Sequence, residues 1–178
     1  MAEPAAISTA KKGLRSLVRR RLAGVSTESL AAQSTAVADR LARFPRYATS
    51  RCVAVFLSMP TLEIDTRPVI DRARESNIGI LVPKIIGPSS ADMRFVHIQP
   101  HECISEFPVD RWRIPDPPQN YTPASLVPRF FLDPHGESSE PLYKGAILPP
   151  VDIVLVPGLA FSPSGARLGH GKGFYGAN

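Results

Sequence analysis

Residues 52–57 read Cys-Val-Ala-Val-Phe-Leu, an uninterrupted apolar run. A strand that is apolar at every position is typical of a sheet covered on both faces. Residues 78–82 and 151–156 have the same character and predict two more buried strands. Residues 93–98 alternate between polar and apolar side chains, which predicts a strand nearer an edge of the sheet.

Helical patterns separate these strands. Ser26 is a good N-cap, and apolar side chains then recur every three or four residues until Pro45. A further helix is expected to begin at Asp65 or Thr66. The alternation of strands and helices predicts an α/β fold with a mainly parallel sheet. With 178 residues, the chain is long enough to bury a core as a single domain.

Composition excludes several classes of protein. The apolar share of 43% argues against a disordered chain, and no run approaches the ~18 apolar residues of a membrane span. Two cysteines are too few for a disulfide scaffold, so we expect a reducing, intracellular setting. Many of the 19 prolines lie in residues 99–150, which predict a long irregular excursion.

The net charge of +5 is confined to the first 25 residues. They hold six basic residues against Glu3, whereas the rest of the chain holds 15 basic and 15 acidic groups. Leu14, Leu17, Val18 and Leu22 form one apolar stripe, so the segment predicts a helix, with a start near Ser8 or Thr9 and an end at Gly24.

Three interpretations of this basic helix are open. Its charges are a solvated face, or the segment is a mitochondrial presequence, or it binds a ligand. Lys11, Arg15 and Arg19 lie in one row, one turn apart. One local patch suits a compact anion better than nucleic acid, which favours basic residues spread over a whole face.

Residues 165–175 read Gly-Ala-Arg-Leu-Gly-His-Gly-Lys-Gly-Phe-Tyr and follow the last buried strand. The glycines leave backbone amides uncovered, and such amides form a nest for phosphate oxygens. Arg167 and Lys172 add positive charge. The spacing fits neither a Walker loop nor a dinucleotide fingerprint, and a glycine-rich surface turn is the structural alternative.

Other candidate positions are ambiguous. His97, His101 and Cys103 lack the regular spacing of a zinc site. Glu63 follows a predicted strand end, where a carboxylate faces a ligand or simply solvent. Trp112 is either a core residue or a stacking wall for a flat ring.

Several motifs together resemble one family, the 5-formyltetrahydrofolate cyclo-ligases, also called 5,10-methenyltetrahydrofolate synthetases. The resemblance rests on residues 11–15, 56–59 with 63–66, 112–115, and 156–161 leading into 165–175. It covers residues 10–178 as one domain, with a Pro-rich insertion at 117–148. The family's fold is a three-layer, Rossmann-like sandwich, here expected to be incomplete at its C-terminal end.

The resemblance implies an ATP-dependent, magnesium-assisted closure of 5-formyltetrahydrofolate to 5,10-methenyltetrahydrofolate. It also implies a cytoplasmic monomer that acts on a small, sometimes polyglutamylated folate, without nucleic acid or membrane partners; a mitochondrial location is the alternative. It assigns ATP to Lys11, Lys12, Gly13, Leu14, Arg15, Arg167, Leu168, Gly169, His170, Gly171, Lys172, Gly173, Phe174 and Tyr175. It assigns the folate to Leu57, Glu63, Trp112, His170, Gly171, Lys172, Gly173 and Phe174.

Two positions depart from the family pattern. His170 stands where the family usually has Arg, and Gly176 stands where it has the Asp expected to bind magnesium, so no metal ligand is assigned here. The alternatives to an active enzyme are an inactive, truncated relative that binds nucleotide or folate without turnover, and a basic-helix protein that docks on an anionic surface.

Overall fold

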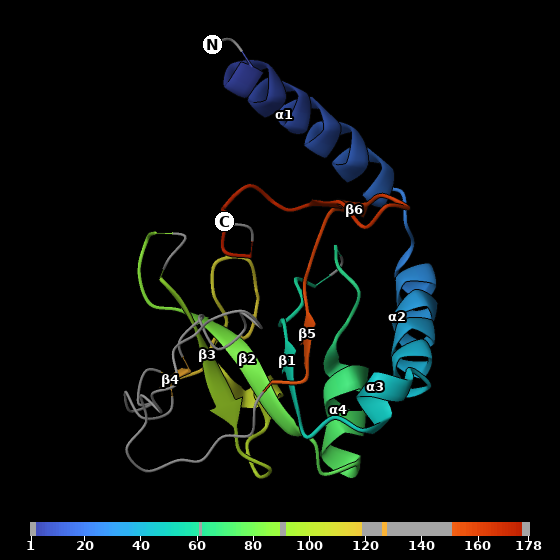
Figure 1. The fold of residues 1–178 in the computed structure, drawn as a ribbon, viewed down its shortest axis with the longest axis vertical. Helices are drawn as coiled ribbons and strands as arrows, with labels where there is room; N and C mark the ends of the chain where they lie inside the picture. Colours follow the sequence, from blue (N-terminus) through green and yellow to red (C-terminus); the bar gives the residue numbers. More distant parts are fainter. Residues whose placement is uncertain (1–2, 61, 90–91, 119–125, 128–150, 176–178) are drawn as a thin grey trace.

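The structure is a computed structural model that describes residues 3–60, 62–89, 92–118, 126–127 and 151–175 (Figure 1). Its elements in chain order are α1 (Glu3–Leu22), α2 (Thr27–Ala42), α3 (Pro45–Ala48), β1 (Cys52–Val55), α4 (Arg67–Glu75), β2 (Gly79–Ile85), β3 (Met93–Ile98), a 3-10 turn η1 (Ile104–Glu106), β4 (Leu126–Val127), β5 (Ile153–Leu155), β6 (Ala160–Phe161) and β7 (Arg167–Leu168).

One mixed sheet has the strand order β4-β3-β2-β1-β5. Strand β1 runs parallel to both of its neighbours, with Val53 opposite Ile80 on β2 and Ile153 on β5. Strand β3 pairs antiparallel with β2 and β4, so four of the five strands point the same way. This confirms the α/β class, the mainly parallel sheet and the position of residues 93–98 near an edge.

Helices α2, α3 and α4 lie together on one side of the sheet (Figure 1). Their side chains, including Ala38, Tyr47 and Ile70, join the strand residues Val53 and Val55 in one buried cluster. The buried cluster on the other face comes from the strands alone, and residues of the C-terminal loop pack against it. In the described part of the chain, loop residues thus stand where the expected third layer would lie.

The helix ends follow local hydrogen bonding. The Ser29 N–H donates to Ser26 Oγ at 3.2 Å, which confirms Ser26 as the N-cap of α2. Thr66 occupies the N-cap position of α4, but its hydroxyl donates instead to the Phe56 carbonyl at 2.8 Å. Phe56 begins the loop between β1 and α4, and Thr66 ends it. The bond therefore holds the two ends of this loop together.

Three expectations need correction. The first helix begins at Glu3 rather than near Ser8 or Thr9, because its first turn continues upstream of those caps. Strand β2 extends to Ile85, since pairing with β3 continues to that residue. Residues 99–150, which the sequence predicted as an irregular excursion, include the 3-10 turn η1 and the strand β4, which pairs with β3. The short hairpin of β6 and β7 after β5 had no counterpart among the sequence predictions. Most of the Pro-rich insertion, 119–125 and 128–150, lies outside the described residues.

Strand β1 begins with Cys52, which is fully buried. Burial raises the pKa of its thiol to about 11, so the thiol stays protonated and unreactive at neutral pH. Within the residues described, no helix combines the length and apolar character needed to cross a bilayer.

We predict that Leu81→Ala lowers the free energy of unfolding by about 2–5 kcal/mol, because Leu81 is fully buried on β2 and its truncation leaves a cavity. Ile85→Ala is the matched control, since Ile85 ends the same strand and is 42% exposed. Its cost is expected to be below about 1 kcal/mol. Chemical denaturation of both variants measures the difference, and equal losses would contradict the assigned register.

Candidate functional site

The site forms where β1 and β5 end. These two strands are parallel neighbours, with Val55 opposite Leu155, so their carboxyl ends lie at the same edge of the sheet. The loop after β1 carries Glu63, and the segment after β5 leads into the glycine loop, which we define as residues 169–173. Ligands of open α/β sheets bind at this kind of edge.

The N-terminal helix meets the glycine loop. Arg15 Nε donates to the Gly169 carbonyl at 2.9 Å, and Arg19 Nη2 lies 3.5 Å from the His170 carbonyl. Arg15 and Arg19 are one turn apart, so one face of α1 makes both contacts. In Figure 1, α1 lies above the sheet, and the C-terminal segment runs between α1 and the sheet.

The glycines of this loop are required by its backbone. Gly171 has a φ of 109° and Gly173 a φ of 79°, which side chains rarely adopt. A Cβ on Gly171 would also lie 3.6 Å from Arg15 Cζ. The loop therefore keeps its amides uncovered next to Arg15 of α1.

Positive charge surrounds this junction. Lys11, Arg19 and Lys172 are exposed, and Arg15 is partly buried against the loop. Arg167 Nη1 donates to the Pro157 carbonyl at 2.8 Å, which fixes its guanidinium beneath the loop. Cations and free amides at one place form an anion site, and arginine suits phosphate through its paired donors.

Tyr175 closes the C-terminal side of the site. The Arg167 guanidinium lies 6.0 Å from the centre of its ring. Burial raises the pKa of Tyr175, and the Glu63 carboxylate raises it further, against the opposing charge of Arg167. The phenol therefore stays protonated at neutral pH and keeps its ability to donate a hydrogen bond. Tyr175 and Phe174 also pack against the strand cluster on the second face of the sheet.

Beside the anion site lies a cavity of about 440 Å³ with mostly apolar walls. Its lining includes Leu30 and Val37 from α2, Phe56 from the end of β1, and Leu155 from β5. Glu63 and His170 are polar groups in this lining, and they come from its two loops. A cavity of this size with apolar walls and few polar groups is typical of a small-molecule site.

Glu63 is held by two donors. The Met59 N–H donates to Glu63 Oε2 at 2.7 Å, and His170 Nε2 lies 3.0 Å from Glu63 Oε1. The side chain of Glu63 is only 13% exposed, whereas that of His170 is 31% exposed. A carboxylate oxygen has two lone pairs, so each oxygen retains one acceptor position for a ligand.

The loop that carries Glu63 is anchored to α2. Ser34 on α2 is buried, and its hydroxyl accepts from the Asp65 N–H at 2.9 Å. The same hydroxyl donates to the Leu30 carbonyl at 2.7 Å, so it bridges the helix and the loop. These bonds fix the carboxylate relative to the cavity.

Not all predicted site residues gather here. Arg15, the glycine loop, Arg167 and Glu63 do, whereas Leu57 is buried in the core and its neighbour Phe56 lines the cavity. Trp112 is 45% exposed and outside the cavity lining, with the Arg111 guanidinium 3.9 Å from its ring centre. Lys11, Lys12, Gly13 and Leu14 lie exposed on α1.

Sequence reasoning missed the role of α2. The repeat that includes Leu30 and Val37 predicted a purely structural seam, but both residues line the cavity and Val37 is 45% exposed. The apolar repeat alone gave no signal of a ligand surface, because exposure is a property of the folded structure. The Met59 amide had no sequence signal, because any residue provides a backbone donor.

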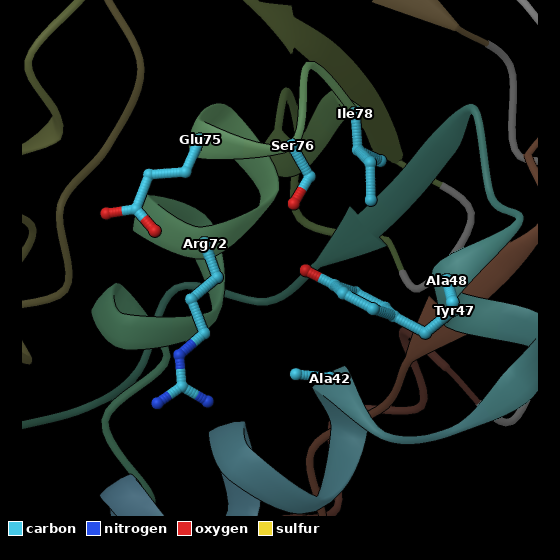
Figure 2. Close-up of a pocket in the computed structure, with 7 residues that line it drawn as sticks. All are labelled: Ala42, Tyr47, Ala48, Arg72, Glu75, Ser76 and Ile78. Carbon is cyan, nitrogen blue, oxygen red and sulfur yellow. The ribbon is translucent and has the colours of Figure 1, made fainter.

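A second cavity, of about 400 Å³, lies between α2, α3 and α4 (Figure 2). Arg72, Glu75 and the Tyr47 ring are among its walls. It holds none of the predicted site residues, and Arg72 already pairs with Asp39. The described residues contain no group of three His, Cys, Asp or Glu side chains that could hold a metal, so His97, His101 and Cys103 do not form one.

Comparisons with known proteins point to one family. The family model of the 5-formyltetrahydrofolate cyclo-ligase family matches residues 7–134 and 133–178. The 5-formyltetrahydrofolate cyclo-ligase of Mus musculus is 27% identical over 95% of this chain and 73% of its own. That of Escherichia coli K12 is also 27% identical, over 89% of this chain and 74% of its own.

A solved structure shares the fold. The NMR structure of 5,10-methenyltetrahydrofolate synthetase from Aquifex aeolicus superimposes with a TM-score of 0.62 at 24% identity, over 93% of this chain and 69% of that one. Because the family model covers nearly the whole sequence, the chain belongs to the 5-formyltetrahydrofolate cyclo-ligase family.

Proposed function

We propose that this chain uses ATP to close 5-formyltetrahydrofolate into 5,10-methenyltetrahydrofolate, with release of ADP and phosphate. The observation that carries the proposal is the contact between Arg15 and the glycine loop beside the Glu63 cavity. The contact supports the proposal because it brings cationic side chains and uncovered amides beside an apolar cavity with a carboxylate, as a reaction between a nucleotide and a folate requires.

The phosphates of ATP fit the cationic side of the site. Arg15 and Lys11 supply charge from α1, and Arg167 and Lys172 supply it from the C-terminal segment. The amides around Gly171 complete a concave set of donors. The contact of Arg15 with the glycine loop also favours an ATP site over a basic helix that docks on an anionic surface. The helix and the loop lie together, so both can bind the same anion.

The folate fits the apolar side. Its flat pterin ring would lie against Phe56 and the α2 side chains that line the cavity. Glu63 would accept hydrogen bonds from the pterin N–H groups through the acceptor positions left on its two oxygens. His170, which reaches the cavity from the glycine loop, lies between the two ligands.

The reaction asks little covalent chemistry of the protein. The formyl oxygen attacks the γ-phosphorus and ADP leaves. The N10 lone pair then attacks the activated formyl carbon, the phosphate departs with the former formyl oxygen, and N10 loses its proton. Phosphoryl transfer of this kind depends mainly on positioning and charge stabilisation. The arginines of α1 and the loop amides supply both.

Among the described residues, no three His, Cys, Asp or Glu side chains gather in a group that could hold a metal ion. Gly176, which stands at the family's expected metal position, carries no side-chain donor. Magnesium that accompanies ATP would be held through phosphate oxygens and water, as it commonly is.

Turnover tests the proposal directly. The chain is mixed with ATP, magnesium and 5-formyltetrahydrofolate, and the absorbance of the methenyl product is followed. Calorimetry on each ligand alone runs in parallel. Product formation that depends on ATP supports the proposal. Binding of both ligands without product would instead identify a relative that binds without turnover.

We predict that Arg15→Ala weakens ATP binding by about 10- to 100-fold, because it removes a charge-assisted contact to phosphate. Folate binding should change far less. Arg20→Ala is the matched control, since Arg20 lies about 140° around the same helix and removes the same charge. Titration calorimetry measures both ligands, and equal loss of ATP and folate affinity in Arg15→Ala would contradict the assigned role.

We also predict that Glu63→Gln weakens folate binding by about 10-fold, since an amide offers one acceptor oxygen where the carboxylate offers two. ATP affinity should stay within about twofold. Glu75→Gln serves as the control, because Glu75 lies in the separate cavity of Figure 2. Unchanged folate affinity in Glu63→Gln would remove Glu63 from the proposed folate site.

A further inference from the structure

His170 belongs to both halves of the site. Its ring nitrogen Nε2 lies 3.0 Å from Glu63 Oε1 inside the cavity lining. Its own backbone carbonyl faces Arg19 at 3.5 Å, and the carbonyl of the preceding residue accepts from Arg15 at 2.9 Å. One residue therefore touches the folate side through its side chain and the cationic helix through its backbone.

The docking of α1 depends on these carbonyls. In the described part of the chain, its side-chain hydrogen bonds to the rest of the protein are the two made by Arg15 and Arg19. Most of its other side chains are exposed, including Leu14 at 47% and Leu17 at 40%. A helix held this lightly can be shifted by a ligand, because an anion between the helix and the loop adds contacts of similar strength.

The position of the glycine loop affects the orientation of the Glu63 carboxylate, because His170 belongs to this loop. The Met59 amide fixes one oxygen of the carboxylate, and His170 is the partner that fixes the other. When the loop is held against α1, the His170 ring is held against Glu63. When the loop moves away, Glu63 keeps one donor only and can turn about its bond to Met59.

We infer that His170 is a positioning residue that couples the two ligand sites, so that a triphosphate bound between α1 and the glycine loop orients Glu63 and strengthens folate binding. The inference rests on the proposed function. Linkage requires the reverse effect as well: folate must strengthen triphosphate binding by the same factor.

The experiment measures folate affinity by titration calorimetry with and without a non-hydrolysable ATP analogue. In the wild-type chain the analogue should tighten folate binding by about fivefold or more, within the usual range of coupling between sites. His170→Ala should bring the coupling factor close to one, whatever its affinity for each ligand alone, because the coupling factor compares folate affinity with and without the analogue in the same variant.

His170→Gln is the conservative variant. The Gln amide nitrogen reaches about as far as Nε2 of histidine and donates a hydrogen bond, so it should restore most of the coupling. A merely structural role for His170 would alter both affinities and leave their ratio with and without the analogue unchanged. Circular dichroism confirms that the variants are folded.

Two outcomes would overturn the inference while leaving the proposed function intact: a wild-type coupling factor of one, or a His170→Ala variant that couples as strongly as the wild type. A wild-type chain that binds neither ligand would refute the proposed function, and the inference with it.

Discussion

The site depends on one hydrogen bond, from the guanidinium of Arg15 to the carbonyl of Gly169, between residues 154 positions apart. Without it, α1 is an exposed basic helix and the glycine loop is a surface turn. The fold makes the contact possible because β5 pairs in parallel with β1, as the last strand in the sheet order. That pairing brings the C-terminal segment to the edge where the loop after β1 ends, and α1 reaches down to the same edge.

The two halves of the site use different kinds of interaction. The cationic half binds phosphate through charge and uncovered amides, which do little to select the rest of the ligand. The apolar half uses a cavity walled by α2, β1 and β5, in which Glu63 and His170 supply polar specificity. Burial of Glu63 at 13% side-chain exposure is tolerated because both of its oxygens have donors. A reaction between a charged nucleotide and a flat ring needs these two environments side by side.

Periodicity predicted the elements that bury large apolar surfaces. The strand at 93–98, the N-cap at Ser26 and the parallel centre of the sheet followed from local patterns. The glycine loop was predictable because Gly171 and Gly173 need positive φ. The cavity wall on α2 was not, since an apolar residue facing a ligand looks like one facing the core. The burial of Leu57 and the exposure of Trp112 could not be predicted from the sequence, because they depend on how the loops pack rather than on residue type.

The central claim is that α1 and the glycine loop bind one anion together. Hydrogen–deuterium exchange with and without ATP tests it most directly, because the two segments lie in separate peptides, 3–22 and 165–175. The account predicts that ATP slows exchange in both segments at the same ATP concentration. Slower exchange in the loop alone, with α1 unchanged at saturating ATP, would contradict it.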